Sequence, residues 1–81
     1  MRRPDTPLDH EPEAVAYARR KAGLSQAEAA KALEVSESLL SMIEKGARNA
    51  TPAMLLRLAE LYNCPVVVLE RKRVGPDGRA A

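Results

Sequence analysis

The sequence has no phenylalanine and no tryptophan, and its two aromatic side chains are Tyr17 and Tyr62. A core without larger aromatic residues has to be built from alanine, leucine, valine, isoleucine and methionine, which suits closely packed short helices. Cys64 is the single cysteine and His10 the single histidine. One cysteine argues against a disulfide framework and a cysteine-based zinc site, and it fits a reducing compartment. We therefore expect no metal and no cofactor.

Long apolar runs are also lacking: none approaches the roughly 20 residues that a bilayer-spanning helix needs, and the N-terminus has no apolar signal-peptide core. We expect a cytoplasmic protein with no membrane segment. The 81 residues predict one small domain, whose stability dimerisation would increase. Thirteen basic and eleven acidic residues give a net charge of +2 and a pI near 9.0. This balance permits nucleic-acid binding, but a solvated mixed surface also explains it.

The stretch from Ser25 to Gly46 predicts two short helices joined by a tight turn. Ser25 can cap a first helix over about residues 26–33, with Glu28 as the return partner of a capping box. Ser36 can cap a second helix, which Gly46 ends in the left-handed conformation. The outward side chains of that second helix are small or adaptable: Glu37, Ser38, Ser41, Met42 and Lys45. This is a helix-turn-helix pattern.

The flanking sequence predicts further helices. Pro12 suits the first position of a helix that ends before Gly23. Thr51 can cap another, with Pro52 at its first position and Asn63 as its left-handed stop. The residues that follow, 65–70, contain a β-branched run that locally favours a strand, so their secondary structure stays open on local grounds.

Three segments, in order, resemble the lambda repressor and Cro-like (XRE-like) helix-turn-helix family. They are LSQAEAA, VSESLLSMIEKG and TPAMLLRLAELYNCP, at residues 24–30, 35–46 and 51–65. The resemblance covers roughly residues 13–69. It implies an all-α fold, a compact bundle of five helices whose short fifth helix follows Pro65. A strand pairing across a two-fold axis is the alternative for that segment, and either form can make a dimer contact.

The family's usual activity is sequence-specific binding of operator DNA as a dimer, so the resemblance implies a recognition helix in the major groove. Base contacts are then expected from four residues of the second helix: Glu37, Ser38, Ser41 and Met42. Contacts to the phosphate backbone are expected from Gln26, Lys45, Arg48 and Asn49. The alternative for all of these positions is ordinary helix or loop surface.

The resemblance also points to an ion pair between Arg19 and Glu44, with two exposed charges as the alternative. Two positions depart from the family pattern. Glu34 stands where the turn usually has glycine, so it has to adopt positive φ at a cost of order 1 kcal/mol. Ala29 stands where leucine is common, and Tyr62 can fill part of the missing volume.

Three parts are expected along the chain: a disordered N-terminal arm (residues 1–11), the DNA-binding domain (residues 12–70) and a basic flexible tail (residues 71–81). We expect a small transcriptional regulator, a repressor that binds an inverted-repeat operator as a homodimer. The alternative is an antitoxin-like or adaptor module that binds a protein partner through an apolar patch at Leu39 and residues 66–69. Paired carboxylates, a nucleophile with its base and a glycine-rich phosphate loop are all missing, so we expect no enzyme.

Overall fold

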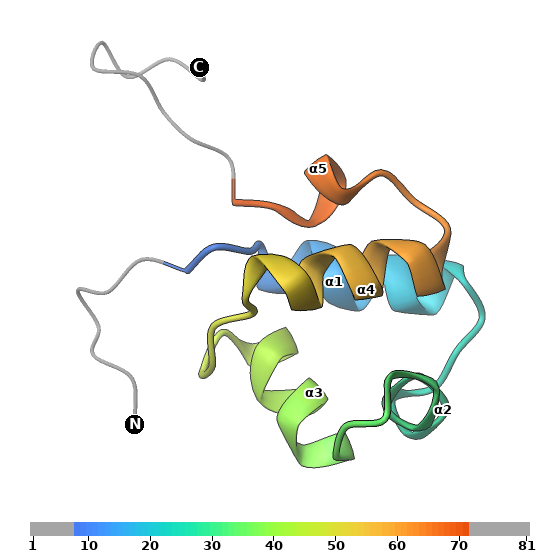
Figure 1. Cartoon of the computed structure of the whole chain (residues 1–81). Coiled ribbons are helices and arrows are strands. Elements are labelled where there is room, and N and C mark those ends of the chain that lie inside the picture. Colours follow the sequence, from blue (N-terminus) through green and yellow to red (C-terminus); the bar gives the residue numbers. More distant parts are fainter. Residues whose placement is uncertain (1–7, 72–81) are drawn as a thin grey trace, which may run out of the picture.

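Side-chain caps mark where three of the described helices begin. The computed structural model describes residues 8–71, and the segments of the expected arm and tail at residues 1–7 and 72–81 lie outside them. Within the described residues the chain is all-α, as predicted. Its helices are α1 (Pro12–Lys21), α2 (Gln26–Leu33), α3 (Glu37–Lys45), α4 (Pro52–Tyr62) and α5 (Val66–Leu69) (Figure 1).

The predicted N-terminal caps are confirmed. The Ser25 hydroxyl accepts from the Glu28 N–H at 3.0 Å, and the Glu28 carboxylate accepts from the Ser25 N–H at 2.8 Å. This reciprocal pair lowers the pKa of Glu28, first through the backbone hydrogen bond at Ser25. Ser36 and Thr51 each accept from the N–H three residues on, at 3.0 and 3.2 Å. The three caps satisfy donors that a helix leaves unpaired in its first turn.

Left-handed residues end three of the helices. Gly46 ends α3 with φ 78° and Asn63 ends α4 with φ 54°, as their residue types predict. Glu34 ends α2 with φ 60°, which confirms that a non-glycine residue occupies the left-handed position of the turn. A guanidinium N–H of Arg57, on α4, donates to the carbonyl of Leu33, the residue just before Glu34. That contact satisfies a C-terminal carbonyl of α2 and ties the turn to α4.

The segment after Pro65 is helical, so the strand alternative is wrong. Pro65 has an extended conformation, and the Val68 N–H donates to its carbonyl at 3.0 Å. Leu69 is fully buried, whereas the Val67 and Val68 side chains are 66% and 47% exposed. A four-residue helix buries its one leucine on the bundle, an outcome that local β propensity does not encode.

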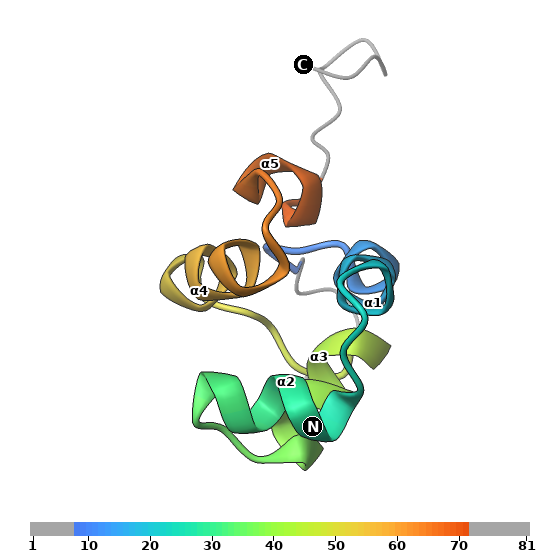
Figure 2. The ribbon, with the colours of Figure 1, turned by 90° about the vertical axis from the view of Figure 1, so that its right-hand side faces the viewer.

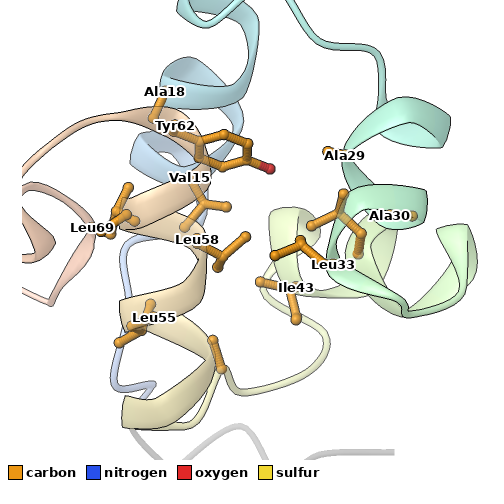
Figure 3. Packing of buried hydrophobic residues seen from close by; sticks show 13 residues of the cluster. Val15, Ala18, Ala29, Ala30, Leu33, Ile43, Leu55, Leu58, Tyr62 and Leu69 are labelled. Carbon is orange, nitrogen blue, oxygen red and sulfur yellow. The ribbon is translucent and has the colours of Figure 1, made fainter.

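The helices are stacked in three tiers, with α5 over the pair α1 and α4, and that pair over α2 and α3 (Figure 2). Between α4 and the lower tier, Leu58 meets Leu33 and Ile43 (Figure 3). The Tyr62 hydroxyl extends from α4 toward Ala29, the place where the sequence leaves volume to fill (Figure 3). Among residues 8–71, no helix has the length and apolar character that crossing a membrane requires.

The segment just before α1, in the last part of the expected arm, is hydrogen-bonded to the end of the described chain. The Glu11 N–H donates to the Leu69 carbonyl at 2.9 Å, and the Arg71 N–H donates to the Asp9 carbonyl at 3.1 Å. Between them, His10 forms an isolated antiparallel bridge with Glu70. In Figure 1 this blue segment runs between the orange end of the described chain and the yellow α3–α4 loop. Arg71, expected as the first tail residue, is therefore hydrogen-bonded to the bundle.

Candidate nucleic-acid interface

Helix α3 has one face in the core and the opposite face outward. Leu40 and Ile43 are buried at 0% and 2% exposure. At 3.6 residues per turn, Ser38 and Lys45 fall opposite these two residues, and both are exposed. The remaining predicted base-contact residues are the exposed Glu37 and the partly exposed Ser41 and Met42. All four predicted base-contact side chains can therefore be reached from outside the bundle.

The predicted ion pair between α1 and α3 is confirmed. Arg19 Nε donates to Glu44 Oε2 at 2.7 Å, and Nη2 donates to Oε1 at 3.2 Å. The third guanidinium nitrogen, Nη1, donates to the Leu24 carbonyl at 2.8 Å. The side chains are only 12% and 6% exposed. The hydrogen bond with Glu44 raises the pKa of Arg19, and the paired side chains fix α3 against α1.

Gln26, the first residue of α2, is hydrogen-bonded to the same ion pair. Its Nε2 donates to Glu44 Oε1 at 3.0 Å. Glu44 therefore accepts hydrogen bonds from two elements, the end of α1 and the start of α2. An amide nitrogen carries two hydrogens, so one N–H of Gln26 is left to donate elsewhere. The predicted phosphate ligand is thus held in place by a residue of α3, a relation that the sequence did not reveal.

The loop that follows α3 carries the other predicted phosphate contacts. The Ala47 and Arg48 N–H groups both donate to the Met42 carbonyl, at 2.9 and 3.2 Å, and the Arg48 side chain is exposed. Asn49 is held from outside the loop: its Oδ1 accepts from the Asp9 N–H at 2.7 Å, and its Nδ2 donates to Asp9 Oδ2 at 2.9 Å. The loop therefore presents an exposed cationic side chain next to an amide that a carboxylate engages.

His10 supports this loop from beneath. The ring is 1% exposed, with Nε2 at 2.7 Å from the Ile43 carbonyl and Nδ1 at 3.3 Å from the Ala50 nitrogen. A carbonyl only accepts and a backbone N–H only donates, so Nε2 carries the proton and Nδ1 accepts. Sequence reasoning missed Asp9 and His10 as supports of the loop. Their partners lie 33 to 40 residues away, and a lone histidine in a charged segment gives no local signal.

Tyr62 places one polar atom inside the bundle. Its side chain is buried, and within the described residues its hydroxyl has no hydrogen-bond partner. Burial is the main cause that raises the pKa of Tyr62 to about 12, and the charge of Glu44 adds to it. The hydroxyl therefore stays neutral at physiological pH, close to the ion pair that fixes α3.

The sequence profile of the helix-turn-helix family matches residues 15–69. The matched range runs from the first turn of α1 to the last residue of α5, and it covers more than half of the chain. A search of curated proteins found no significant match.

Proposed function

The chain belongs to the lambda repressor and Cro-like (XRE-like) helix-turn-helix family, and on this premise we propose that it represses transcription by binding operator DNA. The family is one of DNA-binding regulators and not of enzymes. The observation that supports the proposal is the way α3 is held. Arg19 and Gln26 donate hydrogen bonds to Glu44, near the C-terminal end of α3, while Ser38 on the same helix is exposed. A recognition helix has to be held rigidly and still offer side chains to the groove.

Direct readout falls to the outward face of α3. The major groove of B-DNA admits one α-helix, and each base pair shows a distinct pattern of donors and acceptors there. Ser38 and Ser41 can donate to or accept from several bases, Glu37 can accept from a cytosine amino group, and Met42 can pack against a thymine methyl group. Specificity would come from these four side chains, because phosphate contacts carry no sequence information.

Affinity would come from phosphate contacts on both sides of α3. Gln26 stands at the N-terminus of α2, where the helix dipole favours an anion, and its second amide hydrogen can reach a phosphate oxygen. Lys45 and Arg48, both exposed, stand at the end of α3 and in the next loop, and Asn49 follows them. Such contacts make binding depend on salt without selecting sequence.

Two copies would form the functional unit. One helix reads only a few base pairs, so tight binding needs half-sites about one helical turn, roughly 34 Å, apart. The exposed apolar side chains of α4 and α5 are the proposed contact between copies: Leu56, at 60% exposure, with Val67 and Val68. The DNA-binding domain in this proposal spans residues 12–70, between the arm and the basic tail, and the protein acts in the cytoplasm.

The same exposed apolar side chains favour a second candidate function, binding to a protein partner such as a toxin or a transcription factor. Leu39, expected in that patch, is instead partly buried against the core. A partner surface would therefore centre on α4 and α5 and leave α3 free.

Selection of duplex DNA from a random pool at near-physiological salt tests the proposal. Enrichment of an inverted repeat is expected, and the Ser38→Ala and Met42→Ala variants should enrich an altered sequence. Retention without any sequence preference, or no retention, would overturn the operator-binding function. The protein-partner candidate would then be tested with a Leu56→Lys variant, which should lose the partner and keep the fold.

A further inference from the structure

The amide of Asn49 is occupied by Asp9 at both of its ends. Oδ1 accepts from the Asp9 N–H at 2.7 Å, and Nδ2 donates to the Asp9 carboxylate at 2.9 Å. Asp9 is itself fixed, because its carbonyl accepts from the Arg71 N–H and its neighbour His10 is buried beneath the loop. The Asp9 carboxylate therefore has a fixed position beside the α3–α4 loop, which carries the exposed Arg48.

This arrangement determines what a phosphate would meet at Asn49. One Nδ2 hydrogen points at Asp9, so a phosphate oxygen has to use the other, about 120° away. With two hydrogen bonds of about 2.9 Å each, that oxygen would stand roughly 5 Å from the carboxylate oxygen of Asp9. Two anions at this distance repel each other, and the repulsion opposes the attraction supplied by Arg48.

We propose that Asp9 is a brake on DNA binding: its carboxylate engages the Asn49 amide and lowers the affinity of the α3–α4 loop for the phosphate backbone. The inference rests on the proposed function, since it takes Asn49 as a phosphate contact. The brake acts equally on every duplex, because a phosphate carries no sequence information. Its consequence is that the chain as encoded binds DNA below the affinity that its loop could reach.

The repulsion between Asp9 and a phosphate can be isolated by a variant that removes the negative charge of residue 9 but keeps its side-chain oxygen as an acceptor. In Asp9→Asn, the side-chain oxygen can still accept from Asn49, and the backbone N–H of residue 9 is unchanged. Repulsion of two unit charges at about 5 Å in water, with and without screening at 0.15 M salt, corresponds to about two- to fourfold in affinity for each protomer. For two protomers on one operator, the factor is about four- to sixteenfold.

The experiment compares Asp9→Asn, Asp9→Ala and a matched control, Glu60→Gln, which makes the same change in net charge. Glu60 is exposed on α4, eight residues beyond Pro52, or about 12 Å along the helix from the end next to the loop. Fluorescence anisotropy with a random-sequence duplex and with a selected operator gives the affinities. Both Asp9 variants should bind both duplexes more tightly than Glu60→Gln does.

Three outcomes separate the brake from its rivals. Equal affinity of Asp9→Asn and Glu60→Gln for a duplex that the wild-type chain binds would overturn the brake and leave the proposed function intact. Weaker binding by Asp9→Ala, with Asp9→Asn unchanged, would instead make Asp9 a positioning residue for Asn49. If the wild-type chain selects no operator, the salt concentration at which each variant elutes from immobilised heparin still tests the brake. Asp9→Asn leaving at higher salt than Glu60→Gln supports the brake, and elution at the same salt overturns it.

Discussion

Glu44 of α3 accepts two hydrogen bonds from the Arg19 guanidinium of α1, at 2.7 and 3.2 Å, and the carboxylate is only 6% exposed. The pair fixes α3 against α1. Because both side chains are largely buried, the attraction between them compensates the hydration that each charged group loses.

Breaking this pair from one side should strongly destabilise the bundle. Arg19→Met and Glu44→Gln should each lower the free energy of unfolding by about 3 kcal/mol, because the remaining group stays buried without its partner. Urea denaturation measures the loss, and the double variant gives the coupling energy. Glu13→Gln, at an exposed glutamate of α1, is the control and should change stability by less than about 0.5 kcal/mol. Single-variant losses below about 1 kcal/mol would mean that the pair behaves as a surface ion pair.

His10 should be essential for stability although it lies in a segment with no periodic pattern. His10→Ala leaves the Ile43 carbonyl and the Ala50 N–H without the ring as partner, and it opens a cavity where a fully buried side chain stood. The expected loss is about 3 kcal/mol, from unsatisfied polar groups and lost packing. Urea or thermal denaturation provides the number, and a loss of less than about 1 kcal/mol would contradict the structural role given to residues 9–11.

The turn of the helix-turn-helix should be improved by glycine. Glu34 has φ 60°, and Glu34→Gly removes the cost of a side chain in that conformation, with an expected gain of up to about 1 kcal/mol. Glu34→Ala should give no such gain, because alanine keeps the Cβ atom. Asn63→Gly is the matched control: asparagine tolerates its φ of 54° better than glutamate does, so a smaller gain is expected there. Equal thermal midpoints for Glu34→Gly and the wild-type chain would mean that the left-handed conformation of Glu34 has no measurable cost.

Tyr62 should ionise only in strongly alkaline solution. Its pKa is about 12 in the folded chain against an ordinary value of 10.0, because burial disfavours the tyrosinate. A folded pKa above the unfolded one means that the contribution of this group to stability is complete below pH 10 and is lost as the pH rises to about 12. Absorbance of tyrosinate against pH measures the step, and Tyr62→Phe should remove it. Because the hydroxyl has no partner among the described residues, that variant should also gain roughly 1 kcal/mol in stability.

The two kinds of proposed DNA contact should respond differently to substitution. Lys45→Ala and Arg48→Ala should weaken all duplexes alike and reduce the slope of log affinity against log salt by about 1 each. Ser38→Ala and Met42→Ala should change base preference and leave that slope unaltered. Lys21→Ala is the control cation, since Lys21 lies 5.9 Å over the Tyr17 ring on α1. If Lys21→Ala lowers the salt slope as much as Lys45→Ala, the assignment of the loop to the phosphate backbone is wrong.

The sequence by itself determined helices α1 to α4 and their ends. The capping box at Ser25, the cap at Ser36 and the stop at Gly46 act within three or four residues, so one segment contains both partners of each interaction. Helical periodicity likewise places Leu40 and Ile43 on one face of α3, the face that is buried. The Arg19–Glu44 pair was within reach only through the family resemblance, because its partners are 25 residues apart.

Only the tertiary structure decided where the long-range partners lie. It turned residues 66–69 into a helix, since burying Leu69 on the bundle outweighs the local strand preference of valine. It also directed the amide of Gln26 to Glu44 and that of Asn49 to Asp9. A polar side chain takes whichever partner the fold brings within about 3 Å, and residue type alone does not specify that partner.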